Sequence, residues 1–390
     1  VILPARYAND LKDVPETSAS FEKALHREFA GAYTGIGVHH AAMTQNLQDL
    51  NRQGHQVVDL LVEEAKLACA ELPPVGPAGF TVLQLIAQIS GRVFVGLPLS
   101  RNPEWIGMNI GYLFDSFGAA ARLTSWPWWC RPFVALFAKE TRSLQKHREK
   151  AALMLKPVIE QRIQDHERGA VKNESDRPVD MIQWTLENRG FKARTAEEHM
   201  EIQLALLSVS LLGTTILTSF VLYEIAAHPE LVSALREEIT NVRRENGGSL
   251  TKSTLPKLRL LDSFIKETQR LNATTAVMLN RMVRKETTLS DGTILPAGID
   301  VAVNAMEVNR SEKLWKNADT FDGFRYVKLR NDPGADSKYQ LIKSDVNALN
   351  FGLGGQVCPG RFFAGAEMKV MIAEILSNYD ISFQDKETPV

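Results

Sequence analysis

FGLGGQVCPGRFFA, residues 351–364, is the stretch that decides the fold of this chain. It places four glycines and Cys358 directly before an apolar helical pattern at 362–376. Glycine lets the backbone approach a neighbouring group closely, and a proline after the cysteine suits the first turn of a helix. The pattern therefore predicts Cys358 at a helix N-terminus, where free N–H groups and the helix dipole favour the thiolate that metal ligation requires. A lone cysteine is otherwise most often a small buried apolar residue.

Length and composition set wide limits on the fold. The chain of 390 residues is 44% apolar, enough for one large domain or for two to three ordinary ones. Its 45 basic and 46 acidic residues leave a net charge of −1, which gives no electrostatic argument for a nucleic-acid partner. The cysteines are Cys69, Cys130 and Cys358, too few and too scattered for a disulfide framework or a thiolate zinc site. A reducing, cytosol-facing environment fits this cysteine usage.

Residues 202–223 form a long helical pattern without a charged side chain. Length and hydropathy alone are typical of a transmembrane helix. The stretch also holds many small and polar residues, lacks a basic flank, and is followed by a charged helix at 235–238. We therefore predict a helix over 201–225 that is buried on all sides in a large protein.

Strand-like patterns appear only after this helix. Residues 277–283, 287–289 and 301–303 are rich in β-branched and apolar side chains, and a turn signal lies at 290–293. We expect a small sheet within a mainly helical protein.

Residues 125–133 concentrate aromatic side chains earlier in the chain, with three tryptophans and two prolines. Two interpretations are open. The segment contacts a membrane surface, which indole rings favour, or its tryptophans pack a helix junction.

Three motifs in order carry a resemblance to a known family. The opening stretch is similar to the loop Phe-x-x-Gly-x-x-x-Cys-x-Gly-Arg-x-x-Ala of the cytochrome P-450 family of haem-thiolate monooxygenases, matching at Phe351, Gly354, Cys358, Gly360, Arg361 and Ala364. Glu267 and Arg270 resemble the family's Glu-x-x-Arg helix, and Arg325 lies in a segment that resembles the one whose arginine joins that pair. A Glu-x-x-Arg pair alone is common on helix faces, so the order of the three motifs is what makes the resemblance specific. It covers about residues 80–383 and looks most like membrane-anchored fungal enzymes of secondary metabolism.

The resemblance implies a mainly α fold with a small β region, forming a single haem-thiolate catalytic domain over residues 1–390. It implies haem b, iron protoporphyrin IX, as the cofactor and Cys358 as the axial ligand of its metal, because a thiolate donates electron density that favours O–O cleavage. Glu267, Arg270 and Arg325 are expected to form a buried charged network that supports the loop. The other cofactor-binding residues expected in the loop are Phe351, Gly354, Gln356, Gly360 and Ala364.

Two further residues concern the haem propionates. Arg281, on the strand after the Glu-x-x-Arg helix, is the candidate cationic partner, and the alternative is an ordinary solvated strand arginine. Gln356 departs from the family, in which the residue two positions before the cysteine is usually basic. Glutamine donates hydrogen bonds without charge, so we expect weaker haem retention.

The long helix also departs from the family at the oxygen side of the haem. The family usually places an acid and then a threonine there, which relay protons to bound dioxygen. Counting back from His228 puts Leu212 and Gly213 at these positions, and neither can relay a proton. A shift of one residue puts Thr214 in the relay position. The alternative for Thr214 or its neighbour is a hydrogen bond to the carbonyl four residues earlier.

Three functions stay open on this evidence. Water or a substrate hydroxyl completes the relay in an ordinary monooxygenase, or the relay is absent and the enzyme performs desaturation, rearrangement or radical coupling. The third is a non-catalytic haem-binding relative. Against it, apolar residues expected to line a substrate pocket are present: Val209, Leu212, Val277 and Met278, with Phe94 or Trp105. Ser210 is a further residue expected at that pocket.

The resemblance implies partners and a location as well. Electrons are expected from a separate NADPH-cytochrome reductase, with cytochrome b5 as a further donor, because the chain has no flavin or nicotinamide fingerprint. Lys338, Lys343 and Arg361 are the candidates for docking an acidic reductase. The expected substrate is an apolar polycyclic metabolite such as a terpenoid or alkaloid. We expect the protein to lie at the cytosolic face of the endoplasmic reticulum membrane. We also expect a membrane anchor and first strands before Val1 and a further hairpin after Val390.

Overall fold

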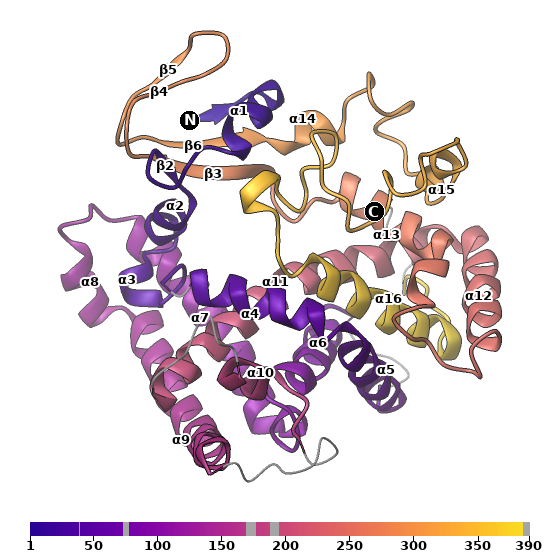
Figure 1. Ribbon diagram of the computed structural model, residues 1–390, viewed down its shortest axis with the longest axis horizontal. Helices are drawn as coiled ribbons and strands as arrows, with labels where there is room; N and C mark the ends of the chain where they lie inside the picture. The colour runs from indigo at the N-terminus through magenta and orange to yellow at the C-terminus, as the bar shows by residue number, and fades with distance from the viewer. Residues whose placement is uncertain (39, 73–77, 169–176, 188–194, 385–390) are drawn as a thin grey trace. The chain divides into compact units, whose positions relative to one another are not determined.

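The computed structural model describes residues 1–38, 40–72, 78–168, 177–187 and 195–384. The protein is mostly helical with a small sheet region, which confirms the predicted fold class (Figure 1). The chain forms two compact units, Val1–Ala24 with Ile216–Val390, and Leu25–Thr215. The single catalytic domain expected over 1–390 stays a prediction.

The unit Leu25–Thr215 is helical. Asn102 caps the start of α7, Pro103–Thr124, since the Asn102 side chain accepts a hydrogen bond from the Glu104 N–H at 2.8 Å and Pro103 occupies the first turn. That helix, α7, packs along α9, and α5 packs against α6. The bounds are α3 Gly31–Thr34, α4 His40–Arg52, α5 Gly54–Ala70, α6 Ala78–Phe94, α7 Pro103–Thr124, α8 Arg131–Phe137, α9 Lys139–Glu167 and α10 Met181–Glu187.

The predicted apolar helix is α11, Ala196–Ala227, whose residues belong to both units. Among the described residues it is the helix long and apolar enough, by length and composition, to cross a membrane. Half of the residues in its most apolar stretch are buried, and Val209 is 58% exposed. The prediction of a helix buried on all sides is therefore wrong for part of its surface.

The tryptophan segment does not pack a helix junction. Trp126, Trp128 and Trp129 are 43%, 78% and 61% exposed. The short helix α8 that follows buries no residue, and Phe133, Leu136 and Phe137 are also exposed. We call the exposed apolar set Trp126, Trp128, Trp129, Phe133, Leu136 and Phe137 the aromatic patch.

The other unit holds the sheet, in strand order β1–β6–β3–β2 (Figure 1). Strand β3 pairs antiparallel with β2 and β6, whereas β1 runs parallel to β6. The predicted strands at 277–283, 287–289 and 301–303 correspond to β3, β4 and β6. The bounds are β1 Ile2–Leu3, β2 Ala19–Ser20, β3 Val277–Val283, β4 Thr287–Thr288, β5 Ile294–Leu295 and β6 Asp300–Asn304.

The core beneath this sheet also anchors the cysteine loop. Leu279, Val283, Val301 and Val303 from the strands pack in one buried cluster with Leu353 of the loop. The loop is thereby held against the sheet. The helices of this unit are α1 Ala8–Lys12, α12 Pro229–Arg244, α13 Arg259–Leu271, α14 Ala305–Asn309, α15 Arg325–Arg330 and α16 Arg361–Asn378, and α2 Phe21–Glu28 begins in it.

Candidate active site around Cys358

The cysteine loop is folded by short backbone hydrogen bonds. The Cys358 N–H donates to the Phe351 carbonyl at 2.7 Å, so the loop closes on itself before α16 begins at Arg361. Gly352 has a φ of +78°, and a Cβ there would lie 2.4 Å from the Gln356 carbonyl oxygen. Only glycine fits this position without a rearrangement. The predicted helix over 362–376 is confirmed, although Pro359 precedes the N-cap Gly360 instead of entering the first turn.

Opposing influences act on the Cys358 thiol. Burial raises the pKa of the thiol, whereas the backbone N–H groups of Gly360 and Arg361 and the charge of Arg361 lower it. These N–H groups lie at the predicted helix N-terminus, and the effect of burial on the pKa of the thiol outweighs their effect. A half-buried thiolate beside these N–H groups is stabilised further by a directly bound cation, so this sulfur suits a metal ligand.

Glu267, on α13, is the centre of a buried charged network. Its carboxylate pairs with Arg270 at 2.8 Å and with Arg325 at 2.9 Å. The remaining guanidinium N–H groups donate to backbone carbonyls, among them Asn309 at 2.7 Å and Lys316 at 2.6 Å. Because every charge has partners, the network fixes the path of the segment between α14 and α15.

Asn309 and Asn350 connect this network to the cysteine loop. The Asn309 side-chain amide donates to Asn350 Oδ1 at 2.9 Å, and Asn350 Nδ2 donates to the Gln269 carbonyl at 3.3 Å. Asn350 directly precedes Phe351. Neither asparagine was expected as a site residue, because asparagine in a loop carries no local signal for such a role.

Arg281 is buried in β3, with only 1% of its surface exposed. Its Nη1 donates to the Asn280 carbonyl at 2.9 Å and its Nη2 to the Leu11 carbonyl at 3.4 Å, but Nε has no partner among the described residues. Burial lowers the pKa of the guanidinium, and the Glu16 charge opposes this shift. The arginine is therefore not a solvated strand residue, and its free N–H suits an anionic ligand group.

The residues expected at the oxygen side of the haem all lie on α11. Leu212 and Gly213 are half-buried and Thr214 is buried. The Thr215 hydroxyl is buried and has no hydrogen-bond partner in the described part of the chain, so it does not bond the carbonyl four residues earlier. These residues belong to Leu25–Thr215, whereas Cys358 belongs to the other unit, so their relation to the thiolate stays a prediction.

The expected substrate pocket is divided in the same way. Val209 and Ser210 lie on α11 in one unit, and Val277 and Met278 lie half-buried on β3 in the other. The Ser210 hydroxyl donates to the Leu207 carbonyl at 3.0 Å. Phe94 and Trp105 are fully buried in the helical unit. The pocket therefore stays a prediction.

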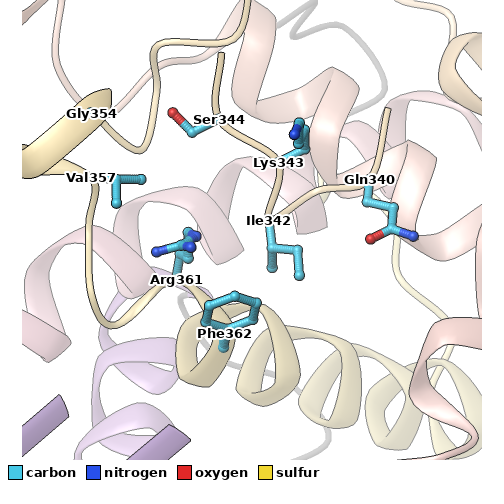
Figure 2. Close-up of a pocket in the computed structure, with 8 residues that line it drawn as sticks. All are labelled: Gln340, Ile342, Lys343, Ser344, Gly354, Val357, Arg361 and Phe362. Carbon is cyan, nitrogen blue, oxygen red and sulfur yellow. The ribbon is translucent and has the colours of Figure 1, made fainter. Parts of the chain in front are cut away.

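A pocket of about 350 Å³ lies beside the cysteine loop (Figure 2). Arg361 and Phe362 from α16 contribute to its wall, and the Arg361 guanidinium lies 4.3 Å from the centre of the Phe362 ring. Lys343 is exposed at the pocket, and Lys338 is exposed earlier in the same segment. The surface beside the loop is concave and positively charged. The pocket is lined by Gln340, Ile342, Lys343, Ser344, Gly354, Val357, Arg361 and Phe362.

Comparison with known proteins gives consistent matches. A family model described as Cytochrome P450 matches residues 38–390. Cytochrome P450 monooxygenase BOA4 of Botryotinia fuckeliana is 37% identical, and the match covers 97% of this chain and 78% of BOA4. Cytochrome P450 monooxygenase ascG of Acremonium egyptiacum is 33% identical, and the match covers 98% of this chain and 77% of ascG. Among solved structures, the retinoic-acid-bound cyanobacterial CYP120A1 shares the fold, with a TM-score of 0.70 at 16% identity over 96% of this chain and 80% of that one.

Proposed function

The chain belongs to the cytochrome P450 family of monooxygenases, and from that premise we propose that it oxidises an apolar polycyclic secondary metabolite, such as a terpenoid or alkaloid. The reaction uses O₂ and electrons from a separate NADPH reductase. The observation that carries this proposal is the coupling of Cys358 to the buried Glu267 network through Asn309 and Asn350. Because the chain belongs to a family of monooxygenases, we do not retain the alternative of a non-catalytic haem-binding relative.

The residues of the cysteine loop suit haem b. Cys358 is the proposed thiolate ligand of the haem iron, since its half-buried sulfur accepts from two backbone N–H groups and would benefit from a bound cation. Arg281 is the proposed partner of the propionates, because its buried Nε lacks an acceptor among the described residues. When bound, the haem iron supplies the activation of dioxygen. The chain's own residues hold the cofactor, shield the sulfur and fix the loop.

Proton delivery is proposed for α11. Thr214 carries the hydroxyl nearest in sequence to the expected relay position, and Leu212 and Gly213 carry no exchangeable side-chain proton. Water or a substrate hydroxyl beside Gly213 is proposed to complete the relay in an ordinary monooxygenation. The alternative, an atypical desaturation, rearrangement or radical coupling, rests on the missing donors at Leu212 and Gly213.

Electrons are proposed to enter beside the cysteine loop. The pocket of Figure 2 is concave, and Lys343 and Arg361 give it positive charge. Lys338 adds a further exposed cation nearby. An acidic surface of an NADPH-cytochrome reductase, or of cytochrome b5, complements this charge.

The aromatic patch is proposed to contact the cytosolic face of the endoplasmic reticulum membrane. Its indole and phenyl rings are exposed, as in interfacial helices. Exposed Arg122, Lys139 and Arg142 flank it and complement anionic headgroups. This contact adds to any anchor that precedes Val1.

Product analysis tests the proposed function. A host that supplies an NADPH reductase is fed apolar terpenoids and alkaloids, with the native chain or Cys358→Ala expressed. We expect a product that has gained one oxygen atom, formed only with the native chain. A product that has lost two hydrogens instead supports the atypical reaction, and a haem-loaded native chain that converts no apolar candidate contradicts the substrate class.

A further inference from the structure

The N-terminal segment 12–21 lies against both the cysteine loop and β3. A Cβ on Gly354 would lie 2.5 Å from the Lys12 carbonyl oxygen, so the loop approaches this segment closely. Strand β2 pairs Ser20 with Met282, the residue that follows Arg281. The Phe21 ring lies 5.9 Å from the Arg281 guanidinium. Ser20 and Met282 are far apart in sequence, yet their segments meet at one edge of the loop.

Glu16 occupies the middle of this segment, where its exposed carboxylate accepts hydrogen bonds from two groups. Both of its carboxylate oxygens accept the Phe21 N–H, at 3.1 Å each. Gln356 Nε2 donates to Glu16 Oε1 at 2.8 Å. One N–H of the loop amide is thereby occupied by a carboxylate of the protein itself.

Arg281 is influenced by the same carboxylate. Glu16 is the acid whose charge acts on the buried guanidinium, yet no ion pair joins the two side chains in the described part of the structure. The Arg281 charge is therefore only partly compensated by the protein. An additional anion at its free Nε is favourable, whereas the negative charge of Glu16 repels that anion.

We propose that Glu16 is a positioning residue for the haem edge: it orients the Gln356 amide and sets the charge that the haem carboxylates meet at Arg281. This inference rests on the proposed haem site. A cationic side chain at position 356 would form an ion pair with Glu16. The proposal therefore explains how glutamine is accommodated there. Glutamine instead donates a hydrogen bond to the Glu16 carboxylate and leaves Arg281 as the charged donor for the cofactor.

Haem retention and reduction potential test the proposal in four proteins: native, Glu16→Gln, Gln356→Arg and the double variant. Glu16→Gln keeps an acceptor for the Phe21 N–H and removes the charge. We expect it to slow haem transfer to apomyoglobin by about 3- to 10-fold and to shift the reduction potential in the positive direction. Gln356→Arg alone is expected to change the transfer rate by less than about twofold, because Glu16 takes up the new charge, whereas the double variant slows transfer by more than about tenfold.

Glu22→Gln is the matched control, since Glu22 is an exposed acid in the first turn of α2, next to this segment, and the described structure gives it no hydrogen bond with Gln356. It is expected to behave like the native protein. The proposal is overturned if Gln356→Arg alone slows haem transfer as much as the double variant, or if Glu16→Gln and Glu22→Gln have equal effects. A native protein without a thiolate-ligated haem spectrum contradicts the proposed function itself, so the two failures are distinguishable.

Discussion

Arg270 donates two hydrogen bonds to Glu267, from Nε to Oε2 at 2.9 Å and from Nη2 to Oε1 at 2.8 Å, with both side chains buried. The same carboxylate accepts from Arg325 and from the Asp322 N–H. One negative charge thus compensates two buried guanidinium groups. Its loss leaves two unpaired charges in the interior, which is costly.

Glu267→Gln is therefore expected to destabilise the protein by about 3–5 kcal/mol. Urea denaturation of the haem-loaded protein, followed by far-ultraviolet circular dichroism, measures the change. Asp322→Asn is the control, because it removes only the partly exposed ion pair with Lys328, worth about 0–1 kcal/mol. Equal effects of the two substitutions contradict the central place of Glu267.

The family resemblance of the three motifs implied this network, the apolar helical pattern after the cysteine predicted α16, and the β-rich composition of 277–283 predicted β3. It did not predict Asn309 and Asn350, because their roles depend on the spatial meeting of α13, α14 and the loop. The burial of Arg281 could not be predicted from the strand pattern either. The alternation of side chains along a strand does not distinguish a solvated arginine from one covered by the N-terminal segment.

Lys266 provides a pH-dependent contribution to stability. Its Nζ donates to the Gln340 carbonyl at 2.7 Å, and burial lowers the pKa of the amine to about 8. In the unfolded chain this lysine stays protonated up to its ordinary pKa of 10.5. Between these two pH values the unfolded state binds more protons, so the free energy of unfolding rises with pH across that window.

The expected rise from Lys266 is about 3 kcal/mol from pH 8 to about pH 10.5. Lys266→Met removes it, which we expect to see as a flatter pH dependence of the urea unfolding free energy than in the native protein. Lys313→Met, at an exposed position, serves as the comparison and should keep the native dependence. Identical pH profiles for the native chain and Lys266→Met would falsify the prediction.

Gly213 gives a test of proton delivery. A Cβ at this position meets no atom of the described residues within 4 Å, so a larger side chain fits. If water or a substrate hydroxyl already completes the relay, Gly213→Thr changes the hydrogen peroxide released per NADPH by less than about twofold, whereas restoring a missing proton donor is expected to lower it about tenfold or more. Gly213→Ala fills the same space without a hydroxyl. A tenfold fall with threonine but not with alanine contradicts ordinary monooxygenation.

The aromatic patch gives a test of membrane contact. Trp128→Ser with Phe137→Ser removes two of its most exposed rings, and we expect about tenfold or greater loss of binding to vesicles of phosphatidylcholine and phosphatidylserine. Ile294→Ser, which removes an exposed apolar residue from β5, should bind like the native chain. Unchanged vesicle binding by the double variant rules out this contact.

The tryptophans illustrate a further limit of prediction from sequence. Indole rings at 125–133 are equally consistent with a packed junction and with an exposed surface, because both environments favour a large ring with one polar edge. The structure shows exposure, since α8 is short and buries none of its residues. Similarly, the uncharged stretch of α11 did not reveal that Val209 is exposed.

The central claim is that Cys358 binds the haem iron, and the carbon monoxide difference spectrum of the reduced protein tests it most directly. The native chain and Cys130→Ala, which changes a half-buried cysteine elsewhere, are expected to show the band of a thiolate-ligated haem. Cys358→Ala is expected to lose that band completely. If the band survives in Cys358→Ala, the thiolate comes from another residue and the assignment is contradicted.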